Sequence, residues 1–163
     1  MRRVLERVNA MQPHTLSIRE LRDTFSLIVD PHSEDRCNEQ IELLGIVSID
    51  VDGNISTFSP ELLGMENASY GDFVFGNVHR NSLEDVLMNP HLIYTHAEIE
   101  EGVRHCAESC SHFDFCKGGA PANKLFENGT FASAGTLYCK LTKQVMFDLM
   151  LEHLETAFAS EVS

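Results

Sequence analysis

The feature that most constrains this chain is a group of four cysteines in its C-terminal half. Cys106, Cys110 and Cys116 lie in one short segment and Cys139 follows later, which gives the spacing C-x3-C-x5-C-x22-C. Three thiolates from one loop can converge on a common point, and a fourth from a later helix can fix that loop to the domain. Sulfur ligands in a tetrahedral set select zinc or an iron-sulfur cluster over hard ions. We therefore expect these four residues to hold one metal centre.

Composition and charge limit the compartment and the partners. Nothing near Met1 resembles a signal sequence, and no stretch approaches the length of an apolar membrane span. We expect a cytoplasmic protein, in which clustered cysteines indicate metal ligands or reactive thiols before disulfides. Cys37 has no second cysteine near it and is expected to be a bystander. The formal net charge of -13 repels phosphates and anionic lipid, so neither nucleic acid nor a membrane is an expected partner.

The residue pattern predicts an α+β fold with a helical N-terminal extension. Residues 1–40 carry helical periodicity and close on a polar, proline-containing linker at residues 30–35. Residues 41–158 are expected to form the main domain, and residues 159–163 a tail.

Within that domain the first elements are expected to be strands. β-Branched residues flank Asp52-Gly53, so residues 43–50 and 55–58 are predicted to form a β-hairpin with a tight primed turn. Residues 72–75 are predicted to add a further short strand.

Helices are expected to follow the strands. Ser82 is a predicted N-cap, and Asn89-Pro90 can end that helix and begin the next. The second helix is predicted over residues 90–104 and delivers the chain to Cys106. A last helix is predicted over residues 141–158.

Spacing alone leaves zinc and an iron-sulfur cluster evenly matched. Zinc sites usually bring a second close pair of cysteines, whereas Cys139 stands alone, and His105 and His112 are candidates to complete a zinc set. Gly118 and Gly119 follow the third loop cysteine, let the backbone approach closely, and could turn amide hydrogens toward sulfur. That feature favours a cluster, because zinc needs it less.

These residues resemble a known family. The cysteine segment with its late Tyr138-Cys139, together with the hairpin, looks like a SPASM domain, and the resemblance runs from about residue 46 to residue 151. SPASM domains form the auxiliary-cluster part of many radical SAM enzymes that modify peptides. Three strings resemble the maturases of glycine-rich-repeat and related cyclophane-forming peptide systems. They are residues 58–64, 118–124 and 127–129.

The resemblance implies one auxiliary 4Fe-4S cluster, held by the four cysteines, in an enzyme that cross-links a ribosomally made precursor peptide. The ligand positions of a second auxiliary cluster correspond to Phe58 and Ala120, so that cluster is not expected. The SAM-cleaving motif C-x3-C-x2-C is absent, because Phe113 stands where its third cysteine would fall. The chain is therefore not expected to cleave SAM alone. SAM would bind only to a missing radical SAM domain or to a separate core chain. Residues 1–29 would resemble the final helix of that missing domain.

Three further side chains are candidates for contacting the peptide or supporting the cluster. Asp114 could act as a base, although a loop carboxylate more often forms a turn. Asn123 and Lys124 could touch substrate or hydrogen-bond across the loop. The alternatives from other classes are a zinc-stabilised protein-interaction module and a substrate-binding remnant without metal.

Overall fold

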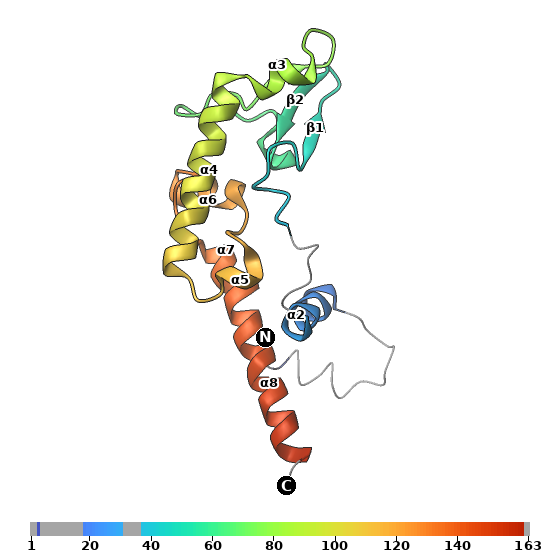
Figure 1. Cartoon of the computed structure of the whole chain (residues 1–163), viewed down its shortest axis with the longest axis vertical. Helices are drawn as coiled ribbons and strands as arrows, with labels where there is room; N and C mark the ends of the chain where they lie inside the picture. Colours follow the sequence, from blue (N-terminus) through green and yellow to red (C-terminus); the bar gives the residue numbers. More distant parts are fainter. Residues whose placement is uncertain (1–2, 4–17, 31–36, 162–163) are drawn as a thin grey trace. The chain divides into compact units, whose positions relative to one another are not determined.

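The computed structural model describes Arg3, residues 18–30 and residues 37–161 (Figure 1). The chain divides into two compact units. We call residues 1–36 with residues 137–163 the terminal unit, and residues 37–136 the central unit. The predicted α+β class is confirmed, since a small antiparallel sheet is combined with several helices.

The described residues of the terminal unit are mostly helical. Helix α2 (Arg19–Val29) confirms part of the helix expected near the N-terminus. The predicted last helix is built from α7 (Leu137–Cys139), a π-helical turn η2 (Lys140–Gln144) and α8 (Val145–Glu161). Apart from Asp30, which follows α2, the predicted linker lies outside the described residues.

A small apolar cluster holds this unit together. Leu21 of α2 is buried with Met146 and Met150 of α8, and Leu149 and Leu154 pack against them. The helical spacing of these positions explains the contact. The last helix is thereby grouped with the N-terminal segment, whereas the sequence interpretation placed it in the main domain.

The sheet of the central unit has three short antiparallel strands in the order β1-β2-β3. Strand β1 (Val47–Ile49) pairs with β2 (Asn54–Thr57), which pairs with β3 (Gly76–Asn77). The predicted hairpin is confirmed, but its turn is longer than a primed turn. A type I′ turn needs positive φ at both central residues, and here only Gly53 has it, at 82°.

The turn is stabilised by one carboxylate. Asp50 Oδ1 accepts hydrogen bonds from the amides of Asp52 and Asn54, both at 2.9 Å. The Asn54 side chain donates to Asp50 Oδ2 at 2.9 Å. These hydrogen bonds lower the pKa of Asp50 below its ordinary value, and the one from the Asn54 side chain has the largest effect.

The third strand lies later in the sequence than predicted. The expectation of a strand at residues 72–75 was wrong, because pairing with β2 occurs at Gly76–Asn77. Phe73 adopts a left-handed conformation with φ of 55°, which interrupts an extended chain. Phe73 and Phe75 are buried and Val74 between them is half-buried, so the segment keeps the alternation of a half-buried strand, although pairing with β2 begins only at Gly76.

The first helices follow their sequence signals. Ser82 caps α3 (Leu83–Leu87) with a capping box, in which Ser82 Oγ accepts from Asp85 N and Asp85 Oδ2 accepts from Ser82 N. Helix α4 (Pro90–Ser109) begins at Pro90 as predicted, and Asn89 Oδ1 accepts from the His91 amide at 2.8 Å. The predicted end at residue 104 was wrong, because α4 continues through Cys106.

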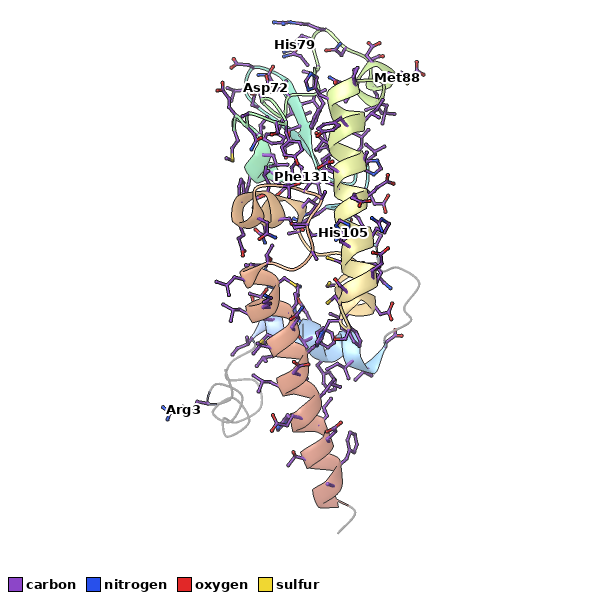
Figure 2. The ribbon with its side chains drawn as sticks, turned by 90° about the vertical axis from the view of Figure 1, so that its left-hand side faces the viewer. Arg3, Asp72, His79, Met88, His105 and Phe131 are labelled. Atoms are coloured by element: carbon purple, nitrogen blue, oxygen red, sulfur yellow. The ribbon has the colours of Figure 1, made fainter. Side chains whose placement is uncertain are left out.

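The core of the central unit is rich in aromatic side chains. Phe131 lies beside α4 (Figure 2) and meets the Tyr70 ring edge-on, with ring centroids 4.7 Å apart. We call the following buried set the aromatic core: Phe58, Leu62, Tyr70, Phe73, Phe75, Leu92, Ile99 and Phe131. Among the helices of described residues, none is long and apolar enough to cross a membrane.

Candidate metal centre

Three of the four predicted ligands lie at the C-terminal end of α4 and just after it. Cys106 occupies the last turn of α4 and is buried, with 6% of its surface exposed. Cys110 ends the helix, where its amide donates to Cys106 O at 2.9 Å. Cys116 ends the short helix α5 (Phe113–Cys116) and is half-buried. The central unit therefore supplies three thiols from one turn-helix segment.

The fourth predicted ligand belongs to the other unit. Cys139 is the last residue of α7 and lies in the terminal unit, whereas the other three cysteines lie in the central unit. Cys37 is exposed, and no disulfide joins any of the five cysteines.

The chain reverses sharply after α5 through left-handed residues. Lys117, Gly118 and Gly119 have φ angles of 50°, 101° and 71°. At Gly118 a side chain is also excluded by space, because an added Cβ would lie 2.8 Å from a methyl group of Val103 on α4. Both requirements explain the glycine pair that the sequence places after Cys116.

The sequence suggested that amide hydrogens of Gly118 and Gly119 would face a cysteine sulfur, but in the structure a carbonyl oxygen does so. The carbonyl of Gly118 lies 3.9 Å from Cys106 Sγ and accepts from that thiol. The Gly119 amide donates to Cys116 O at 3.3 Å. Metal binding at Cys106 would require loss of the thiol proton and of this contact.

A residue that the sequence analysis did not single out fixes the outer side of the reversal. Asn38 Nδ2 donates to Gly119 O at 2.8 Å and to Lys117 O at 3.4 Å. The contact joins positions 81 residues apart, and nothing in the sequence around Asn38 signals it. Asn38 therefore pins the segment between Cys116 and α6 (Pro121–Asn128).

Two of the three polar candidates are unremarkable in their surroundings. Asp114 is exposed and forms an ion pair with Lys117 Nζ at 3.4 Å. Such a surface pair contributes about 0–1 kcal/mol. Asn123 is half-buried and makes no side-chain hydrogen bond to the described residues.

Lys124 is the exception among the candidates. Only 4% of its surface is exposed, and its Nζ donates to the carbonyl oxygen of Gly102, on α4, at 2.8 Å. Among the described residues no carboxylate pairs with it. A buried ammonium is normally paired or neutralised, so this side chain calls for an explanation.

The two positions that would ligate a second auxiliary cluster are occupied by side chains with other places in the fold. Phe58 is fully buried in the aromatic core, with its ring stacked on His96 at a centroid distance of 6.0 Å. Ala120 is the N-cap of α6, and its carbonyl accepts from the Lys124 amide. Neither side chain carries a metal-binding atom.

The histidine nearest the loop on α4 is already engaged. His105, labelled on α4 in Figure 2, places Nδ1 2.9 Å from Ala132 O and Nε2 3.0 Å from Glu101 Oε1. Glu101 also pairs with Arg104, whose pKa is raised by the carboxylates of Glu101 and Glu108. His105 therefore has no ring nitrogen left for zinc in this arrangement.

Zinc and an iron-sulfur cluster make different demands on the side chains around the cysteine segment. Within the described ranges, no three side chains of His, Cys, Asp or Glu converge closely enough to hold a single ion. A zinc ion needs each sulfur about 2.3 Å from one centre. By ligand type alone, the three thiols of the segment suit either zinc or an iron-sulfur cluster.

Comparison with known proteins gives one relative without a described role. The chain is 37% identical over 140 residues to an uncharacterized protein, sll1766, of Synechocystis. The match covers 85% of this chain and 34% of the relative, so the chain spans about a third of that protein's length. No family model matches the chain. No solved structure matches it.

Proposed function

We propose that this chain is the auxiliary-cluster part of a radical SAM/SPASM enzyme that cross-links a ribosomally made precursor peptide. Cys106, Cys110, Cys116 and Cys139 would ligate one 4Fe-4S cluster, which supplies redox or structural chemistry when bound. The observation that carries the proposal is the C-x3-C-x5-C segment, whose first cysteine is buried on α4 and whose last two lie in the following turn and short helix.

The chain's own residues would shape and hold that centre. Gly118 allows the reversal after Cys116 to lie directly against α4 at Val103. Asn38 holds the other side of the reversal through two backbone carbonyls. Phe58 fills space in the aromatic core where the resemblance would place a ligand of a second cluster. One cluster per chain is therefore the proposed stoichiometry.

SAM cleavage is assigned to another part of the enzyme. The segment that contains C-x3-C has Phe113 in place of a third close cysteine. The Synechocystis relative has about two thirds of its length outside the match, which leaves room for a radical SAM domain. The proposal predicts C-x3-C-x2-C in that unmatched part, and its absence there would remove the radical SAM assignment.

The cluster itself is tested by metal analysis. The full chain is purified without oxygen, reconstituted with iron and sulfide, and assayed for both elements and for colour. The proposal predicts a brown protein with about four irons and four sulfides per chain. A colourless protein with about one zinc would establish the zinc-stabilised interaction module instead.

Single cysteine substitutions identify the ligands. Replacement by serine at Cys106, Cys110, Cys116 or Cys139 is expected to lower the iron content sharply, since serine is a poor ligand for these irons. The matched control is Cys37→Ser, which removes an exposed cysteine outside the proposed set and is expected to leave iron content unchanged. Equal iron content in all five variants would contradict the ligand assignment.

A further inference from the structure

The buried side chain of Lys124 carries an inference that rests on, and goes beyond, the proposed function. Lys124 lies on the inward face of α6 beside Ala122 and Leu125, which belong to the core. An apolar side chain would be the normal occupant of such a position. Placing a charged amine there costs stability unless another group offsets the charge.

The contacts within the central unit offset that charge only in part. An ammonium has three donor hydrogens, and in the described residues the one acceptor of Lys124 Nζ is the Gly102 carbonyl at 2.8 Å. Two donors and the full positive charge are left without an anionic partner there.

The location of the ammonium points toward the cysteine segment. Gly102 and Cys106 are four residues apart on α4, so they share one face and are separated by about 6 Å along the helix axis. Both are buried. The carbonyl that Lys124 contacts is also the one that normally pairs with the Cys106 amide within an α-helix. Lys124 is thus held one helical turn from the first proposed ligand.

We propose that Lys124 is a positioning and charge-compensating residue for the metal centre. A cluster with four thiolate ligands is anionic, and one-electron reduction makes it more so, so a buried cation beside it stabilises the reduced form. The ammonium that is costly in the metal-free chain becomes favourable when the thiolates are assembled. Lys124 thereby raises the reduction potential of the centre.

The test compares variants with and without the charge. In the reconstituted full chain, Lys124→Met is expected to lower the one-electron midpoint potential by about 59 mV or more, a tenfold change in the ratio of reduced to oxidised centre. Lys124→Arg keeps the charge, so its ratio of reduced to oxidised centre is expected to stay within threefold of the wild-type ratio. The control is Lys117→Met, which removes a half-buried lysine whose charge already pairs with Asp114, and it is expected to leave the potential unchanged.

A second measurement separates charge compensation from a purely structural role. In the metal-free chain, Lys124→Met is expected to have a denaturation midpoint equal to or above that of wild type, because it removes an uncompensated buried charge. A lower midpoint, or a variant that fails to fold, would show a structural fastener and overturn the inference, as would a wild-type potential in Lys124→Met. Wild-type protein without iron would instead overturn the proposed function itself, and this inference with it.

Discussion

The aromatic core and the cysteine segment, residues 106–119, belong to the same unit but depend on different interactions. The core is a buried set of packed aromatic and aliphatic side chains, with Phe58 and Phe131 fully buried. Residues of the segment after Cys106 are mostly exposed or half-buried, and α5 buries none of its side chains. Its reversal uses left-handed backbone at Lys117 and beyond. The contrast indicates that packing supports the body of the unit, whereas in the segment a bound ligand would mainly add local order.

The polar groups of the two regions differ in the same way. In the core, the Tyr70 hydroxyl contacts Glu98 and Thr130, each at 3.1 Å, and burial raises the pKa of that hydroxyl. Beside the segment, Lys124 is buried with one neutral acceptor among the described residues. The hydroxyl network is satisfied within the unit, whereas the buried amine has no carboxylate beside it among the described residues.

The largest expected effect is loss of an aromatic ring from the core. Phe131→Ala should lower the free energy of unfolding by about 3–5 kcal/mol, because it removes the ring that Tyr70 and Phe73 pack against. The measurement is chemical denaturation of the metal-free chain. Phe126→Ala is the control, since that ring is 48% exposed on α6 and its loss should cost about 0.5 kcal/mol or less. Equal losses would show that the core is not the main source of stability.

A smaller effect is expected where α4 meets the loop that carries Phe131. In Gly102→Ala the new Cβ would lie 2.1 Å from Phe131 O, so the loop must move. We expect a net destabilisation of about 1–3 kcal/mol, measured by denaturation, despite the better helix propensity of alanine. Gly135→Ala is the matched control, because nothing lies within 4 Å of its added Cβ. A neutral Gly102→Ala would mean that this crossing is loosely packed.

A still smaller effect, confined to acid pH, is expected at the hairpin. The folded-state pKa of Asp50 lies below its ordinary value of about 3.9, so its stabilising contribution is complete above that value. The contribution is lost as pH falls through the folded-state pKa. Asp50→Asn should therefore flatten the decline in unfolding free energy below about pH 4. An unchanged pH profile of that free energy would exclude a role for this carboxylate.

The smallest effect on global unfolding is expected from removing the metal. In reconstituted protein, a chelator should increase amide hydrogen exchange in residues 110–119 and leave exchange in β2 and the buried face of α4 unchanged. The measurement is hydrogen exchange by mass spectrometry before and after chelation. Exchange rising equally across the central unit would show that metal, not the aromatic core, maintains this fold.

Local chemistry made a good part of the fold predictable. The hairpin around Asp52-Gly53, though not its tight primed turn, was confirmed, as were the Ser82 cap and the start of α4 at Pro90; all three depend on neighbouring residues. The strand at residues 72–75 was misplaced because the left-handed bend at Phe73 depends on burial by distant elements. The end of α4 was misplaced because packing carries the helix past residue 104 to Cys106.

The sequence by itself determined the candidate ligands, because the cysteine spacing and the glycine pair after Cys116 can be read directly from it. Only the tertiary structure decided which residues surround them. Asn38 holds a reversal 81 residues away, and Lys124 reaches into the interior to contact Gly102 on another helix. Contacts of this kind join segments far apart in the chain, and the side chains that make them look like ordinary surface residues until burial is known.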